Sequence, residues 1–171
     1  GVIYFDGKHV TRDINKAIHY YTLAANQNHS DAQFILGVIY FDGKHVTRDI
    51  NKAIHYYTLA ANQNHSDAQF ILGVIYFDGK HVTRDINKAI HYYTLASNQN
   101  NSDAQFNLGV IYLDGKRVTR DINKAIHYFT LAANQNHSNA QLSLGIIYLD
   151  GQYVTRDINK AIHYFTLAAN Q

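Results

Sequence analysis

Apolar side chains recur at helical spacing in two stretches of residues 30–64, and a polar segment containing Gly43 lies between them. Ala32 and Leu36 share one face of the first stretch, and Ala53 and Tyr57 share one face of the second. The pattern therefore predicts two helices joined by a turn.

The first of these predicted helices is apolar on a second side as well. Phe34, Val38 and Phe41 lie on the side opposite Leu36. A helix of this kind is expected to pack both against its partner helix and against a neighbouring helix pair. One pair cannot bury all of its own apolar surface, so about three stacked pairs are needed for a stable core.

The same pattern returns along the chain with a period of 36 residues. The stretch VTRDINKAIHY occurs five times without a substitution, starting at residues 10, 46, 82, 118 and 154. Residues 1–171 are therefore expected to form a single array of about 4.75 repeats, with the first repeat truncated at its N-terminal side. This leaves no room for a second domain.

Residues of the N-cap and C-cap types set the expected helix bounds. Ser30 and Gln33 fit a capping box, Thr47 and Asp49 are both N-cap types, and Asn64 suits the left-handed conformation that ends a helix. Bounds of this kind are accurate to about two to four residues. The first helices of the repeats are expected at 30–42, 66–78, 102–114 and 138–150, and the second helices at 13–27, 49–63, 85–99, 121–135 and 157–171.

The residues that recur in phase resemble the Sel1-like repeat, a relative of the tetratricopeptide repeat. They are Ala32, Leu36, Gly37, Tyr40, Gly43, Val46, Asp49, Lys52, Ala53, Tyr56, Tyr57, Ala60 and Ala61. The resemblance implies an all-α fold, a right-handed α/α solenoid or superhelix of antiparallel helix pairs, in which the first helices line the concave surface. The chain departs from the family where His45 and Asn64 replace commonly found glycines.

Composition and motifs argue against several classes of function. The chain has no cysteine, a formal net charge of +2, and lysines and arginines spread evenly over the repeats, so we expect no nucleic-acid partner. It has no apolar run of roughly 18 residues that could span a membrane. It also lacks glutamate, a phosphate-binding loop and a serine nucleophile motif. We therefore expect neither enzymatic activity nor a cofactor.

Eleven histidines raise the question of a metal site. Five of them occupy the same position in each second helix: His19, His55, His91, His127 and His163. Equivalent positions in stacked helix pairs are on the order of 10–20 Å apart, whereas zinc ligands lie about 2 Å from the metal. We therefore expect a row of solvated histidines on the convex surface and no metal site.

One position of the first helix changes from apolar to polar along the array, reading Ile35, Ile71, Asn107 and Ser143. A buried site would rarely accept all three residue types, so this stripe is expected to be exposed. The resemblance, in which the first helices line the concave surface, makes the stripe the expected floor of a peptide-binding groove edged by aspartates. Neutral variation on a solvated face explains the stripe equally well. The predicted groove residues are Asp31, Ile35, Val38, Asp42, Asp67, Ile71, Val74, Asp78, Asp103, Asn107, Val110, Asp114, Ser143, Ile146 and Asp150.

The resemblance implies a non-enzymatic scaffold that binds a protein or peptide partner on its concave face. The near identity of the repeats leaves open an alternative, which is a structural, recently duplicated or consensus-designed array without a dedicated ligand. The repeats at the two ends lack a polar cap, as Val2, Ile3 and Tyr4 illustrate. We therefore also expect end-to-end self-association.

Overall fold

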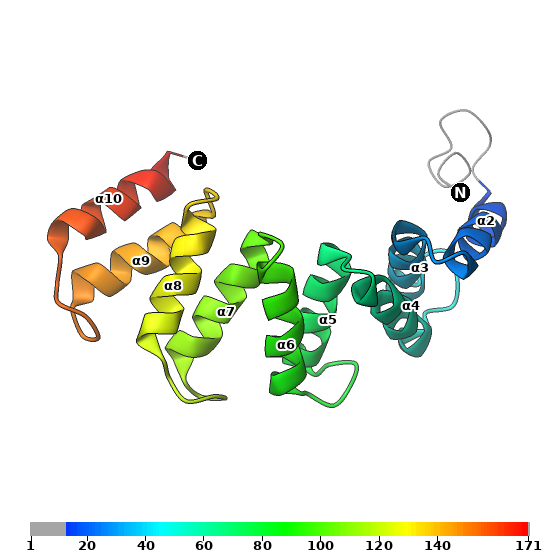
Figure 1. The fold of residues 1–171 in the computed structure, drawn as a ribbon, viewed down its shortest axis with the longest axis horizontal. Coiled ribbons are helices and arrows are strands. Elements are labelled where there is room, and N and C mark those ends of the chain that lie inside the picture. Colours follow the sequence, from blue (N-terminus) through cyan, green and yellow to red (C-terminus); the bar gives the residue numbers. More distant parts are fainter. Residues whose placement is uncertain (1–12, 171) are drawn as a thin grey trace. The chain divides into compact units, whose positions relative to one another are not determined.

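A computed structural model describes residues 13–170 of the chain, and it is entirely helical over these residues, with no strand. The helices are α2 (Ile14–Asn26), α3 (Ser30–Asp42), α4 (Ile50–Asn62), α5 (Ser66–Asp78), α6 (Ile86–Ser97), α7 (Ser102–Asp114), α8 (Ile122–Ala133), α9 (Ser138–Asp150) and α10 (Ile158–Ala169) (Figure 1). The all-α fold of repeating helix pairs is confirmed. The first helices match their predicted bounds, and the second helices begin one residue later and end one or two residues earlier than expected.

The chain divides into two compact units, one ending at Asp85 and the other beginning at Ile86. In unit 1, α3 packs against both α2 and α4, and α5 packs against α4. In unit 2, α7 packs against α6 and α8, and α9 packs against α8 and α10. Each of α3, α7 and α9 therefore packs between two neighbouring helices, as the sequence predicts, although Val38 on the second apolar side of α3 is exposed.

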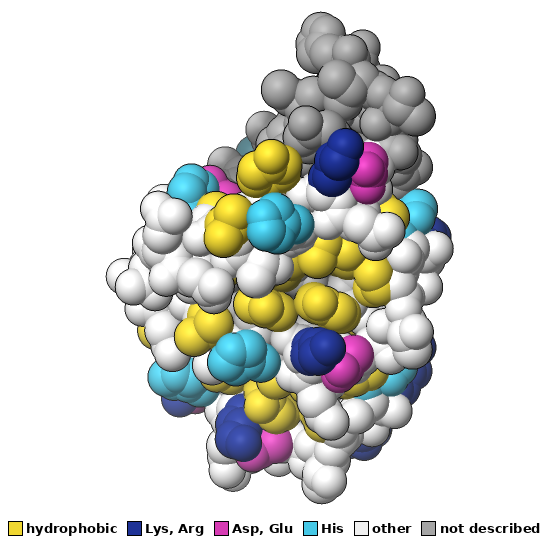
Figure 2. All heavy atoms as spheres, turned by 90° about the vertical axis from the view of Figure 1, so that its right-hand side faces the viewer, with side chains coloured by type: hydrophobic (Ala, Val, Ile, Leu, Met, Phe, Trp, Pro, Cys, Tyr) yellow, Lys and Arg dark blue, Asp and Glu magenta, His cyan; other side chains and the backbone are white. Residues whose placement is uncertain are grey.

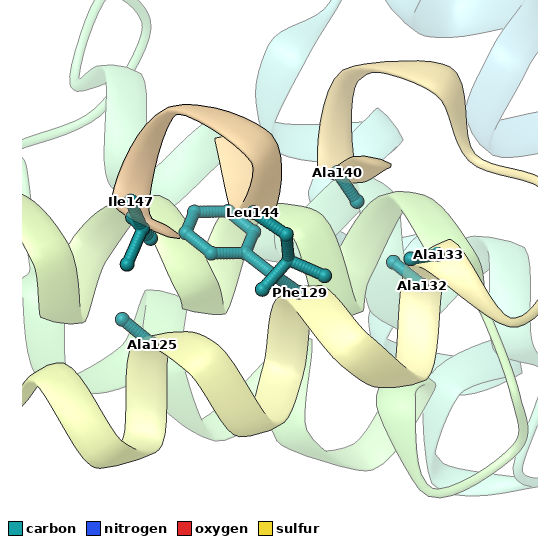
Figure 3. Close-up of a cluster of buried hydrophobic side chains, with 7 residues drawn as sticks. All are labelled: Ala125, Phe129, Ala132, Ala133, Ala140, Leu144 and Ile147. Atoms are coloured by element: carbon teal, nitrogen blue, oxygen red, sulfur yellow. The ribbon is translucent and has the colours of Figure 1, made fainter. Parts of the chain in front are cut away.

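Small and large apolar side chains alternate in the core. In unit 2, Ala125 and Phe129 of α8 face Leu144 and Ile147 of α9 (Figure 3). Phe129 is 1% exposed, and the alanines beside it let the two helices approach closely. Close packing of this kind makes the core sensitive to any change in side-chain volume.

Glycine on the first helix makes room for an aromatic ring of the next helix. A Cβ atom added at Gly37 of α3 would lie 2.5 Å from Cδ1 of Tyr57 in α4. The same relation holds between Gly109 and Phe129 in unit 2. Only a residue without a side chain fits here unless the ring or the helix shifts.

The turn after each complete second helix is left-handed at an asparagine. Asn64 has a φ of 61°, and Asn28, Asn100 and Asn136 have φ values of 61° or 62°. Asparagine tolerates this conformation better than most residues. The predicted left-handed end of the second helix is therefore confirmed, and asparagine takes the place of the family's glycine there.

The predicted capping box at Ser30 and Gln33 is wrong. The N-cap of α3 is His29, and in α5 the N-cap His65 accepts a hydrogen bond at Nδ1 from the amide of Ala68 at 3.3 Å. Gln33 is buried, and its Nε2 donates instead to the carbonyl of Ala25 in the preceding helix at 3.1 Å. A buried amide needs a partner, and the end of α2 supplies one. By contrast, Asp49 caps α4 as predicted.

Burial gives Tyr57 a role in the response to alkaline pH. Desolvation by burial, reinforced by the charge of Asp42, raises the pKa of the Tyr57 phenol far above its ordinary value. The unfolded chain ionises this tyrosine near pH 10, while the folded chain keeps it neutral. The stability that this residue contributes is therefore complete below about pH 10 and is lost as the pH rises further.

Tyr57→Phe should accordingly weaken the loss of stability above pH 10. One of the equivalent positions in unit 2 is Phe129, so the repeat accommodates phenylalanine. The measurement is the urea midpoint of both proteins at pH 8 and pH 10.5, followed by circular dichroism. A fall in midpoint that is the same in the variant as in the parent chain would contradict this assignment.

Candidate peptide-binding groove

The predicted stripe on the first helices is half-buried. This holds for Ile35 and Ile71 in unit 1 and for Asn107 and Ser143 in unit 2. Ile35 packs against the core between α2 and α3. Ser143 Oγ donates a 2.8 Å hydrogen bond to the carbonyl of Asn139 within its own helix. The stripe is thus more covered than expected, because it borders a helix contact, and its role as a groove floor stays a prediction.

The apolar position three residues further along each first helix is more open. Val38, Val110 and Ile146 are 40%, 37% and 53% exposed, and Val74 is half-buried. Exposed branched side chains on the same face of successive helices offer an apolar contact surface within each unit. Val38, Val110 and Ile146 are therefore the apolar residues of the predicted groove that are exposed to solvent.

In unit 2 this surface is hollowed. A depression of about 350 Å³ lies between the C-terminal halves of α7 and α9 and the loops that follow them. Its lining comprises Val110, Leu113 and Asp114 from α7, Ile146, Ile147 and Asp150 from α9, and Arg120 and Tyr153 from the loops. The hollow therefore brings together four of the predicted residues, namely Val110, Asp114, Ile146 and Asp150.

The aspartates at the start of the first helices do not take part. Asp103 precedes Asp114 by 11 residues, which corresponds to about 16 Å along a helix. Asp103 lies 3.3 Å from Nε2 of His137, and Asp31 lies 3.4 Å from Nε2 of His65 in unit 1. The predicted acidic edge thus consists of two separate sets of carboxylates, and only the set at the helix ends borders the hollow.

Two lining residues from the loops, Arg120 and Tyr153, were missed by the sequence analysis. The guanidinium carbon of Arg120 lies 5.1 Å from the centre of the Tyr153 ring, and Nη1 donates to the Tyr153 hydroxyl at 3.0 Å. Nη2 donates to the main-chain carbonyl of Asp114 at 3.3 Å. The sequence signal that could have pointed to Tyr153 was the variation between repeats at this position, where unit 1 has His45 and His81.

The corresponding arginine of unit 1 is held in a similar way. Arg48 Nε donates to the carbonyl of Phe41 at 2.9 Å, and Arg48 Nη2 lies 3.1 Å from His81 Nε2. Arginine at this position therefore braces the loop of its own repeat against the loop of the next repeat.

Lysines neutralise most carboxylates at the helix ends. Asp42 pairs with Lys44 at 3.1 Å, and Asp114 pairs with Lys116 at 3.0 Å. The pair formed by Asp78 and Lys80 is 2.8 Å long, and the hydrogen bond from Lys80 lowers the pKa of the Asp78 carboxyl. These pairs make the predicted groove less acidic than the aspartates alone suggest.

The histidines of the second helices are exposed, as predicted. His55 packs edge-on against Tyr56 with ring centres 5.4 Å apart, and His127 packs in the same way against Tyr128. Figure 2 shows histidines as separate surface patches and basic side chains lying beside acidic ones. Residues 13–170 contain no group of three or more histidine, cysteine or acidic side chains placed to hold a metal ion.

The apolar face of α10 is open among the described residues. Ile158 and Ile162 are 43% and 58% exposed, whereas the equivalent Ile122 and Ile126 of α8 are half-buried. The residues Val2, Ile3 and Tyr4 lie outside the described part of the chain. End-to-end self-association therefore stays a prediction.

Helix pairs of constant length, stacked within each unit, define a helical repeat protein. The Sel1 repeat pattern matches residues 1–29, 30–65, 66–101, 102–137 and 138–171. The chain therefore belongs to the Sel1 repeat family, and the resemblance seen in the sequence is confirmed. Sel1 repeat proteins are non-catalytic helical scaffolds that generally take part in protein interactions.

Three solved structures illustrate the similarity. A Sel1 repeat protein from Oxalobacter formigenes is 34% identical with a TM-score of 0.87, over 99% of this chain and 69% of that one. The protective antigen c5321 of uropathogenic Escherichia coli, which has an SLR fold, is 30% identical with a TM-score of 0.94, over 99% of this chain and 36% of that one. Cysteine rich protein B of Helicobacter pylori is 28% identical with a TM-score of 0.58, over 78% of this chain and 96% of that one.

A comparison with curated proteins found no match. Within residues 13–170, no helix is long and apolar enough to cross a membrane.

Proposed function

We propose that the chain is a non-enzymatic scaffold that binds an extended peptide segment of a partner protein on the exposed face of its first helices. The observation that carries the proposal is the apolar hollow between α7 and α9, where Val110 and Ile146 are exposed beside two carboxylates. Concave sites lined by apolar groups with a few polar ones at the rim are typical of ligand binding.

The hollow suits one side chain of a peptide and not a whole folded domain. Its volume of about 350 Å³ accommodates a residue of the size of leucine or lysine with part of its main chain. Burying one such side chain contributes about 1.5–3 kcal/mol, so useful affinity requires further contacts along the same face. Asn107 and Ser143 supply hydrogen-bonding groups on that face, in keeping with recognition of an extended main chain.

The test is a selection of 12-residue peptides, displayed on phage, against the immobilised full chain. Binding of the enriched peptides is then compared between the parent chain and Ile146→Ser. Because Ile146 is 53% exposed, this substitution should leave the fold intact and weaken binding by about tenfold, the loss of about 1.4 kcal/mol of apolar contact.

Leu23→Ser is the matched control, because Leu23 lies on α2, outside the predicted groove, and is 45% exposed. It should leave peptide binding unchanged. Failure to enrich any peptide would favour the alternative of an array without a dedicated ligand. Enriched peptides that bind Ile146→Ser and the parent chain equally would place the binding site elsewhere.

A further inference from the structure

Asp150 lines the hollow, and it lacks the lysine partner that the equivalent aspartates of the other repeats have. Asp42, Asp78 and Asp114 are each followed two residues later by a lysine that forms an ion pair with them. At Asp150 the corresponding residue is Gln152. Asp150 is exposed and makes no ion pair or side-chain hydrogen bond within the described residues.

The other charged groups at the hollow are already engaged. Asp114 holds Lys116 at 3.0 Å. The guanidinium of Arg120 stacks on the Tyr153 ring and donates to both the Tyr153 hydroxyl and the carbonyl of Asp114. Arg120 therefore has two of its donors and one face occupied, whereas the Asp150 carboxylate remains free to accept from a ligand.

The apolar side chains beside Asp150 determine which cation fits. Val110 and Ile146 offer exposed aliphatic surface next to the carboxylate. Lysine and arginine have long aliphatic stems that lie along apolar surface while the charged head reaches a polar group. A short or purely ionic ligand would leave this apolar surface uncovered.

We infer that the hollow of unit 2 selects a lysine or arginine side chain of the bound peptide, with its stem against Val110 and Ile146 and its charged group on Asp150. This inference rests on the proposed peptide-binding function and adds the residue that the hollow prefers. The preference belongs to unit 2, because Asp42 and Asp78 at the equivalent positions of unit 1 are both neutralised by their own lysines.

The test uses four fluorescein-labelled peptides of the sequence Gly-Ser-Ser-Leu-X-Leu-Ser-Ser-Gly, in which X is lysine, arginine, norleucine or glutamate. Norleucine keeps the aliphatic stem of lysine and lacks the charge. Fluorescence polarisation with the full chain should show that the lysine and arginine peptides bind about twofold to fivefold more tightly than the norleucine peptide, a gain typical of an exposed ion pair. The glutamate peptide should bind most weakly, and raising the salt concentration should narrow the differences.

Two variants of the chain test whether the preference for lysine over norleucine depends on the Asp150 carboxylate. Asp150→Asn should abolish the difference between lysine and norleucine. Gln152→Lys should abolish it too, because it restores the lysine found two residues after the aspartate in the other repeats. Asp49→Asn is the control: Asp49 caps α4 in unit 1, outside the predicted groove, and asparagine caps a helix about as well as aspartate. The loss of this carboxylate should leave the preference unchanged.

The outcomes separate the inference from the function on which it rests. Equal binding of the lysine and norleucine peptides, or a lysine preference that survives in Asp150→Asn or in Gln152→Lys, overturns the assignment to Asp150 and leaves peptide binding intact. Tightest binding of the glutamate peptide would show that Arg120 dominates, which also overturns it. Absence of binding by all four peptides overturns this inference, and the phage selection then decides whether the proposed function fails with it.

Discussion

Replacing Ala53 by aspartate should destabilise unit 1 by several kcal/mol. Ala53 is 0% exposed in the middle of the apolar face of α4, and that helix packs against both α3 and α5. The new carboxylate would be buried in the apolar core, which is one of the costliest changes in a protein. The expected cost is about 3 kcal/mol or more.

The matched control is His55→Ala, two residues further along the same helix. His55 is exposed and packs edge-on against Tyr56. Its loss should change the free energy of unfolding by no more than about 0.5 kcal/mol. Urea titration of the full chain, followed by circular dichroism, compares the two variants. A stable Ala53→Asp together with an unfolded His55→Ala would mean that the buried and exposed faces of α4 are interchanged.

The fold could be predicted from the sequence because every repeat contains the same local pattern of apolar and turn residues. The helical spacing of apolar residues, the turn at Gly43 and the left-handed turn at Asn64 each depend only on residues a few positions away in the sequence. The capping box failed because the role of Gln33 depends on the preceding helix, whose end supplies the carbonyl of Ala25 as its partner. Local pattern alone cannot distinguish that bond from a bond to the amide of Ser30.

The candidate site could be predicted only in part, for the same physical reason. Val110 and Ile146 were among the predicted groove residues. Their exposure does not follow from the apolar pattern, because that pattern placed the equivalent Val38 on the side expected to pack against a neighbouring helix pair. The bond between Arg120 and Tyr153 joins residues 33 positions apart, so it depends on how one loop lies against the next. The pairing of Asp114 with Lys116 spans two residues, and the contrast between lysine and Gln152 was already visible in the sequence.

A second large effect is expected at Gly109, where two physical effects of opposite sign compete. Alanine is favoured over glycine inside a helix by about 1 kcal/mol, so helix propensity alone predicts that Gly109→Ala stabilises α7. The added Cβ, however, would lie 2.5 Å from Cδ1 and 2.6 Å from Cε1 of Phe129. Carbon atoms do not approach so closely, and therefore the ring or the helix must shift.

The Phe129 ring has little space into which it can move. It is 1% exposed and packs among Ala125, Leu144 and Ile147 (Figure 3). Overpacking of a close-packed core costs about 1–3 kcal/mol, and occasionally more. Because most of this range exceeds the gain of about 1 kcal/mol in helix propensity, we expect Gly109→Ala to destabilise unit 2 by up to about 2 kcal/mol net.

A double-mutant cycle separates the clash between the new methyl group and Phe129 from the gain in helix propensity. Phe129→Leu alone should destabilise the chain, because it removes buried ring atoms. Combined with Gly109→Ala, it should cost less than the sum of the two single changes by about 1 kcal/mol or more, since the smaller side chain makes room for the new methyl group. A Gly109→Ala chain with a higher urea midpoint than the parent, or strictly additive effects, would show that α7 and α8 are not in the close contact that this glycine permits.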